Sequence, residues 1–224
     1  MNQEFHLVQR ETTVKGDPFF YYAPAGDETV CGTYAAIKED DFKLENINIE
    51  DGDVILDLGS NVGLFSCLFA KIYPCTKILA FDANPLACLC AKMNRCRNSI
   101  TNLEIFNKAI GSENKKDVEF YSNAINISAS VEKKYADAQD TKYKCDSITI
   151  SDIFDSPILG VEKVKYLKID IEGGEWDIMN YICDKRRDLI ERIENLHLEI
   201  HAYPWAAELK EKVRDYFGDK YLNY

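Results

Sequence analysis

The 224-residue chain has little of what nucleic-acid-binding and membrane proteins usually show. Acidic residues outnumber basic ones by 38 to 27, which gives a formal charge of −11 and no general footprint for a phosphate backbone. The first ten residues lack the apolar core of a signal peptide, and no later run is long enough to span a bilayer. The sequence therefore predicts a cytoplasmic protein with neither a nucleic-acid nor a membrane partner.

Metal-binding cysteine spacing is also lacking, although the chain contains eight cysteines. Cys88 and Cys90 form C-x-C inside a helical stretch, and no nearby C-x-x-C or histidine pair completes a zinc site. Most cysteines lie in apolar or mixed helical stretches, which is typical of reduced thiols that pack as small hydrophobic residues. The glycosylation tripeptide at Asn126 is interpreted as a chance match.

The dinucleotide-binding fingerprint G-x-G-x-x-G is missing after the apolar run at Val54–Leu58. Gly59 is followed by Ser60 and Asn61, and the next glycine, Gly63, comes two positions too late for a pyrophosphate cradle. A strand, a glycine turn and a helix still predict a ligand at the strand's carboxyl end. An adenosine cofactor without phosphates fits this turn, with the carboxylate of Asp57 accepting its ammonium, and S-adenosylmethionine has such a group.

Apolar runs alternate with helical stretches from residue 51 onward, which predicts an α/β fold with a doubly wound, mostly parallel sheet. Residues 51–224 are expected to form the cofactor-binding domain, and residues 1–50 an appendage or lid. Main strands are predicted at 54–58, 77–81, 103–109, 164–169 and 196–201, and helices at 62–72, 85–94, 175–183 and 205–217. A further strand is predicted at 117–123, and 147–154 fits either a strand or a helix. Residues 219–224 leave little room for a closing hairpin.

Asp82 ends the second predicted strand about twenty residues beyond the glycine turn, where an acid can accept both ribose hydroxyls. The neighbouring Ala83 and Asn84 are expected beside it, and Asn107, Lys108 and Ala109 beside the adenine ring. Ordinary loop roles remain the alternative for these residues. The remaining cofactor contacts are expected from the first turn: Gly59, Ser60, Asn61, Gly63, Leu64 and Phe65.

The densest polar cluster follows the fourth predicted strand, where Asp170, Glu172 and Glu175 crowd one crevice. Glu175 could instead cap the helix that follows. His201, at the end of the fifth predicted strand, could accept a proton near neutral pH. Asp170, Glu172 and His201 are therefore the predicted catalytic residues. Asp170 and His201 could also hold a divalent cation; the sequence leaves base and metal open and predicts no metal.

Three stretches together resemble the FkbM family of S-adenosylmethionine-dependent methyltransferases. They are Val54–Phe65, Phe81–Pro85 and Leu167–Glu175, the last of which reads L-K-I-D-I-E-G-G-E. The resemblance implies a Rossmann-like class I methyltransferase fold and O-methylation of a hydroxyl on a sugar, glycan or secondary metabolite. In contrast with the family pattern, Asp82 stands where a glutamate is common, and part of the usual carboxyl-terminal hairpin is expected to be missing.

Two other functions fit parts of the same pattern. A nicotinamide-dependent oxidoreductase shares the sheet and the acidic strand end, but it needs the glycine spacing that this chain lacks. A catalytically silent cofactor-binding module needs Asp57 and Asp82 but not the later acids. The aromatic segment Phe19–Tyr22 is expected either to cover the acceptor as part of a lid or simply to pack on the domain.

Overall fold

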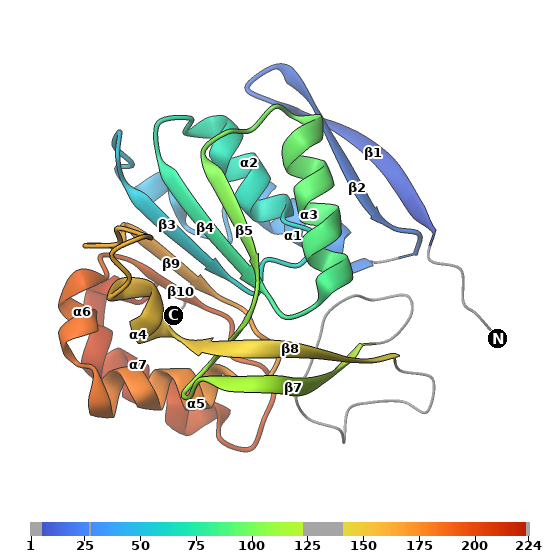
Figure 1. The fold of residues 1–224 in the computed structure, drawn as a ribbon. Helices are drawn as coiled ribbons and strands as arrows, with labels where there is room; N and C mark the ends of the chain where they lie inside the picture. Colours follow the sequence, from blue (N-terminus) through green and yellow to red (C-terminus); the bar gives the residue numbers. More distant parts are fainter. Residues whose placement is uncertain (1–5, 27, 123–140, 223–224) are drawn as a thin grey trace.

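The computed structural model describes residues 6–26, 28–122 and 141–222, and its centre is a five-stranded parallel sheet (Figure 1). The strands are β3 (Val54–Leu58), β4 (Lys77–Asp82), β5 (Leu103–Asn107), β9 (Tyr166–Ile169) and β10 (Leu196–Leu198). Their spatial order is β10-β9-β3-β4-β5. The chain order reverses between β3 and β9, and open α/β sheets bind ligands at such a switch point.

Side chains on the central strands are buried on both faces of the sheet. In β4, Ile78 and Ala80 join one apolar cluster, whereas Leu79 and Phe81 join the other, because successive strand residues point to opposite faces. Strands buried on both sides read as continuous apolar runs, which is the pattern that predicted them.

Helices cover the two faces separately (Figure 1). The first cluster packs under α1 (Glu28–Lys38), α2 (Leu64–Ile72) and α3 (Pro85–Arg97). The second packs under α4 (Ile150–Phe154), α5 (Glu175–Asn180), α6 (Asp188–Arg192) and α7 (Ala206–Phe217). The predicted doubly wound α/β fold is confirmed. No helix in the described ranges is both long and apolar enough to cross a membrane.

Helix boundaries follow local chemistry. The helix predicted from residue 62 begins at Leu64, because Asn61 and Gly63 have φ angles of 50° and 70° that no right-handed helix accepts. Asn84 caps α3, since its side chain accepts from the Leu86 N–H at 2.9 Å and Pro85 follows as the first helical residue. Beyond α5 the chain continues as a π-helical turn over Tyr181–Lys185.

A second sheet lies beside the first, with the order β6-β8-β7. Its strands are β6 (Ala109–Gly111), β7 (Lys115–Ser122) and β8 (Thr141–Thr149). The single strand predicted at 103–109 is therefore wrong, because the chain leaves β5 after Asn107 and pairs Ala109 with Ser147 of β8. Residues 147–154, predicted as either a strand or a helix, contain both: they end β8 and then form α4. Thr149 and Asp152 form a capping box at the start of α4.

The amino-terminal segment forms an antiparallel hairpin of β1 (Leu7–Val14) and β2 (Asp17–Pro24). Phe19 and Tyr21 are buried in the cluster under α2 and α3. Asn98 of α3 accepts from the Phe20 N–H at 3.0 Å and donates to its carbonyl at 2.6 Å. Asn94, one turn earlier, accepts from the Tyr22 N–H at 2.5 Å and donates to its carbonyl at 3.1 Å.

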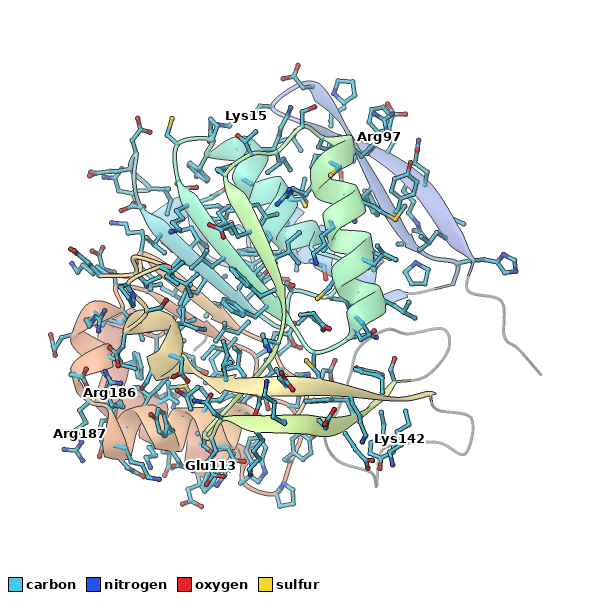
Figure 2. All side chains as sticks on the ribbon, in the orientation of Figure 1. Lys15, Arg97, Glu113, Lys142, Arg186 and Arg187 are labelled. Atoms are coloured by element: carbon cyan, nitrogen blue, oxygen red, sulfur yellow. The ribbon has the colours of Figure 1, made fainter. Side chains whose placement is uncertain are left out.

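Further contacts hold the hairpin on the same side of the domain. Arg97 stacks over the Phe20 ring, 4.0 Å from its centre, and Lys15 donates to the Ile72 carbonyl at 3.0 Å (Figure 2). The aromatic segment thus packs on the domain, and the buried Phe19 and Tyr21 side chains give the lid interpretation no support. The division at residue 50 stays a prediction.

The carboxyl-terminal part differs from the prediction at one strand. The strand expected over 196–201 stops at Leu198, so His201 lies in the loop before α7. After α7 a short 3-10 turn over Gly218–Lys220 leads to Tyr221, which makes one parallel bridge with Leu196. Up to residue 222 the described chain forms no closing hairpin. The tripeptide at Asn126 lies outside the described residues.

Candidate active site

A cavity of about 260 Å³ opens at the carboxyl ends of the central strands. It reaches from the turn after β3 to the turn after β9, and the second sheet forms one of its walls through Val118, Phe120 and Ser147. The predicted cofactor residues that line it are Gly59, Asn61, Asp82, Ala83, Lys108 and Ala109. Asp170 and Glu172, predicted to be catalytic, line it as well.

The main-chain N–H groups of the turn after β3, residues 59–63, all donate hydrogen bonds within the protein. The N–H groups of Gly59 and Ser60 donate to the Phe81 carbonyl at 2.9 and 3.0 Å. The three that follow donate to the Asp82 carboxylate, the Asn61 side chain and the Ser60 carbonyl, at 2.7, 2.7 and 2.8 Å. A pyrophosphate cradle needs such donors free to face the ligand, so the geometry agrees with the glycine spacing in disfavouring a dinucleotide.

Both glycines of this turn are required by close packing. Gly59 has a φ of +83°, and a Cβ there would lie 1.6 Å from the carbonyl oxygen of Asp170. Gly63 has a φ of +70°, and its Cβ would lie 2.7 Å from that of Ala91 on α3. The turn is thus pressed between β9 and α3, which fixes the wall of the cavity.

Asp57, the predicted partner of the ammonium, is fully buried beneath the turn and does not line the cavity. Its carboxylate accepts from the Ser66 hydroxyl at 2.5 Å and lies 3.3 Å from Nζ of Lys168. Lys168 also contacts Asp170 Oδ2 at 3.3 Å and the Gly59 carbonyl at 3.2 Å. Burial alone would lower the pKa of Lys168, but Asp170 and Asp57 hold it above the ordinary range, so this side chain is a buried cation.

Asp82 lines the cavity at the end of β4. Its carboxylate accepts the Asn61 N–H at 2.7 Å and the Asn84 N–H at 2.8 Å. Burial raises the pKa of Asp82 to about 6, against the lowering effect of these two hydrogen bonds. The position suits a ribose diol, and that role stays a prediction.

The other predicted cofactor residues support the wall from behind. Asn107 donates to the carbonyls of Asp82 and Ala83 at 3.0 and 2.9 Å, which fixes the end of β4. Leu64 and Phe65 are buried in the core, and Ser60 is buried beside them. Like Asn84 and Gly63, these residues are absent from the cavity lining, so direct contact with a cofactor stays a prediction for them.

The turn after β9 meets His201, which brings the three predicted catalytic side chains together. His201 Nε2 lies 3.2 Å from Glu172 Oε2 and 3.9 Å from Asp170 Oδ1. Glu172 has a φ of 54°, an unusual conformation for a residue other than glycine. One ligand atom from each of the three lies within 4.8 Å of the others, close enough to share one metal ion.

Glu175 belongs both to the crevice and to the first turn of α5, although no side-chain hydrogen bond among the described residues caps this helix. It is the first residue of α5 and is fully buried, and its carboxylate accepts the N–H groups of Gly173 at 3.0 Å and Ile171 at 3.3 Å. The same carboxylate lies 2.9 Å from His201 Nδ1. The contact between Glu175 and His201 was not predicted, because it depends on where the loop after β10 returns to the sheet.

The charge of His201 follows from this setting. Burial lowers its pKa, but the hydrogen bond to Glu175 and the attraction of Glu172 and Asp170 outweigh it and raise the pKa to about 9. The ring is therefore protonated at neutral pH, whereas a general base must be neutral. His197 differs, because it is buried, and burial together with the nearby Lys168 lowers its pKa to about 4.

The wall formed by the second sheet was not predicted as part of the site. Phe120 lines the cavity and lies parallel to Tyr143, with 6.0 Å between ring centres. Phe81 also lines the cavity, although its side chain is buried in the core and stacks on Phe106 at 4.8 Å. An apolar wall of this kind suits a flat base such as adenine. The sequence predicted a strand here but not its pairing with β8.

Comparisons with known proteins agree with this arrangement. A family model described as the methyltransferase FkbM domain matches residues 57–224. The curated relatives include Methyltransferase 1 from Beauveria bassiana, which is 26% identical over an alignment of 159 residues; the match covers 64% of this chain and 64% of the relative. Methyltransferase sdnD from Sordaria araneosa is 22% identical over an alignment of 172 residues; the match covers 65% of this chain and 66% of the relative. This chain thus spans about two thirds of the length of both.

A solved structure shares the fold. The S-adenosylmethionine-dependent methyltransferase from Agrobacterium tumefaciens has a TM-score of 0.51 and 14% identity, covering 92% of this chain and 58% of its own. At that identity the likeness concerns the fold alone. The family model, in contrast, matches three quarters of the chain. The chain therefore belongs to the FkbM family of S-adenosylmethionine-dependent methyltransferases.

Proposed function

We propose that this chain is an S-adenosylmethionine-dependent O-methyltransferase, whose acceptor is a hydroxyl group of a small molecule or carbohydrate. One observation carries the proposal: a single cavity joins the turn after β3 and Asp82 to the carboxylates of Asp170 and Glu172. A donor bound at one end would meet an acceptor at the other, and methyl transfer depends mainly on such alignment.

The cofactor end offers contacts for each part of an adenosyl group. Asp82 can accept the ribose hydroxyls, and the apolar wall at Val118 and Phe120 can contact the adenine. When bound, the cofactor supplies a methyl group that its sulfonium has already activated. Asp57 is committed to Ser66 and Lys168, so Asp170, which faces the cavity, is a nearer acidic partner for a cationic group.

The acceptor end explains why an oxygen is favoured as the methyl acceptor. A hydroxyl must lose its proton during methyl transfer, and a carboxylate within reach can take it. Glu172 faces the cavity and is placed to take this proton, and Nε2 of His201, 3.2 Å from its Oε2, orients it. The formal acidity of the cavity also favours a neutral acceptor over a phosphorylated one.

The two alternative functions make different demands. A nicotinamide oxidoreductase would need free main-chain donors in the turn after β3, and those of residues 59–63 are engaged. A silent binding module would not need Glu172 and His201 to be held together. The cytoplasmic location belongs to the proposal too, supported by the described cysteines being free thiols.

Calorimetry with S-adenosylhomocysteine tests the cofactor assignment. We expect micromolar binding in the unmodified chain, strong weakening in Asp82→Ala and no change in Asp215→Ala, whose side chain is exposed on α7. Equal affinity in Asp82→Ala would remove the ribose assignment. Binding of NADH in place of S-adenosylhomocysteine would remove the function.

Methyl transfer itself is tested with tritiated S-adenosylmethionine and a panel of sugars, phenols and hydroxy acids. Glu172→Gln should lower turnover at least tenfold while the affinity for S-adenosylhomocysteine stays within about twofold, because the glutamate serves the acceptor. Equal loss of turnover and affinity would assign Glu172 a structural role. Methylation of amines only would replace the O-methyl assignment.

A further inference from the structure

We propose that Asp170, Glu172 and His201 form a binding site for one divalent metal ion, which would hold the acceptor's hydroxyl. The binding site stands on the geometry of these three side chains. The part that the ion would play in methyl transfer rests on the proposed function.

The ligand atoms already have separations close to those of a coordination sphere. Metal–ligand distances near 2.1 Å place neighbouring ligands of an octahedron about 3 Å apart and opposite ones about 4.2 Å apart. Nε2 of His201 lies 3.2 Å from Glu172 Oε2 and 3.9 Å from Asp170 Oδ1, and all three ligand atoms lie within 4.8 Å of one another. Small side-chain rotations would bring all three onto one ion.

Residues behind the site aim each ligand. The Glu175 carboxylate lies 2.9 Å from His201 Nδ1, and this contact turns Nε2 toward Asp170 and Glu172. Lys168 forms an ion pair with Asp170 Oδ2 at 3.3 Å, which leaves Oδ1 on the side of His201. In metal sites the second nitrogen of a ligating histidine almost always meets a carboxylate or carbonyl in this way.

The charge around the ring independently favours a cation. Four carboxylates lie within 4.0 Å of His201: those of Asp170, Glu172, Glu175 and Glu199. With Asp57, which shares Lys168, the group has five formal negative charges. Lys168 offsets one of these charges, which leaves an excess of four around a neutral, metal-binding imidazole, and of the five acids only Glu199 is exposed. A divalent ion would offset half of this excess where the acids converge.

The site is open on the side where a substrate would arrive. Asp170 and Glu172 line the cavity that continues to Gly59 and Asp82. Three protein ligands leave about three positions of an octahedron for water or an acceptor oxygen. A hydroxyl bound there would lose its proton more readily, because the ion would stabilise the alkoxide, and the proton would pass to the Glu172 oxygen that does not bind the ion.

A mixed set of carboxylates and one imidazole suits first-row divalent ions, so Mn²⁺ is the probe. Electron paramagnetic resonance measures the free Mn²⁺ that remains as MnCl₂ is added to the full chain. We expect one site with a dissociation constant of about 10–100 µM and at least tenfold weaker binding in Asp170→Asn, Glu172→Gln and His201→Gln. Asp177→Asn should bind Mn²⁺ as the unmodified chain does, since its exposed carboxylate lines the same cavity but belongs to no ligand set.

Thermal unfolding followed by circular dichroism accompanies each titration and shows that a variant is folded, and calorimetry with S-adenosylhomocysteine is carried out on the unmodified chain. If the unmodified chain binds no Mn²⁺ up to about 1 mM, or if Asp177→Asn weakens binding as much as the ligand variants do, the metal site is wrong. If the chain binds S-adenosylhomocysteine but does not bind Mn²⁺, the metal site is disproved and the proposed function stands. Site-specific Mn²⁺ binding without S-adenosylhomocysteine binding would support the metal site and remove the proposed function.

Discussion

The turns that follow β3 and β9 are neighbours at the switch point of the sheet, yet they are held in different ways. The first, over residues 59–63, is tied to the end of β4 through its main-chain N–H groups and depends on glycine geometry. The second, over residues 170–174, is held by ionised side chains that come from β9, α5 and the loop after β10. We therefore expect added side-chain volume to destabilise the first turn, and removal of a charged side chain to destabilise the second.

The steric side of this comparison predicts the largest effect. Gly59→Ala puts a methyl group 1.6 Å from the Asp170 carbonyl oxygen at a φ of +83°, and neither backbone can yield without moving a central strand. We expect a loss of at least about 5 kcal/mol in the free energy of unfolding, measured with urea. The control is Gly16→Ala, which has a φ of +89° but nothing within 4 Å of the added Cβ. It should cost only about 1–2 kcal/mol. Equal losses of unfolding free energy in the two variants would show that the positive φ, and not the close contact with Asp170, causes the destabilisation.

The charge that joins the two turns comes next. Lys168→Met leaves Asp57 and Asp170 without their buried cation, and we expect about 3–5 kcal/mol of destabilisation in the same urea experiment. Lys163→Met is the matched control, because Lys163 pairs with Glu194 at 2.6 Å but on the surface. That change should cost at most about 1 kcal/mol. If both variants lose the same free energy of unfolding, the burial of Lys168 does not strengthen its ion pairs with Asp57 and Asp170.

Asp82 belongs to the first half of the cavity and gives a pH-dependent prediction. Its pKa is raised to about 6, so the carboxylate is ionised above pH 6 and can accept ribose hydroxyls, but becomes protonated as the pH falls through 6. Calorimetry at pH 7.5 should find S-adenosylhomocysteine bound about 10- to 100-fold more weakly by Asp82→Asn. Between pH 7.5 and 5 the unmodified chain should approach the variant, with a midpoint near 6. A parallel pH dependence in the variant would assign the titration to another group.

The smallest effect distinguishes the turns by their amide protons. Glu175→Gln replaces a charged acceptor of the Gly173 and Ile171 N–H groups with a neutral one. Their hydrogen-exchange protection should fall about fivefold, which corresponds to about 1 kcal/mol. The Gly63 N–H, which donates to the Ser60 carbonyl at 2.8 Å, should keep its protection. A uniform loss in both turns would mean that they open as one unit.

The same contrast explains how far the sequence could predict the structure. β3, β4, α3 and the turn at Gly59 depend on local patterns: apolar runs, glycine spacing and the Asn84–Pro85 cap. The break between β5 and β6 depends on β8, which pairs with Ala109 from about forty residues away along the chain. No local pattern contains that information.

The residues around the turn after β9 were predicted from the sequence, but the protonation of His201 was not. The sequence predicted Asp170 and Glu172 in one crevice and His201 at the end of the fifth strand, yet His201 reaches them from a loop after β10 has ended. Its protonation depends on Glu175, which is distant in sequence and buried beneath it. A pKa is a property of the assembled surroundings, so the base assignment could not be judged from residue type alone.

Asn94 and Asn98 also close an exposed edge. Spaced by one helical turn, their amides take the outward main-chain groups of Tyr22 and Phe20 as a neighbouring strand would. Because β1 occupies the other side of β2, this strand has no free edge at these positions on which a second molecule could add a strand. Replacing both amides by alanine would leave a strand edge that invites intermolecular β-pairing, so these two polar side chains protect the folded chain against aggregation.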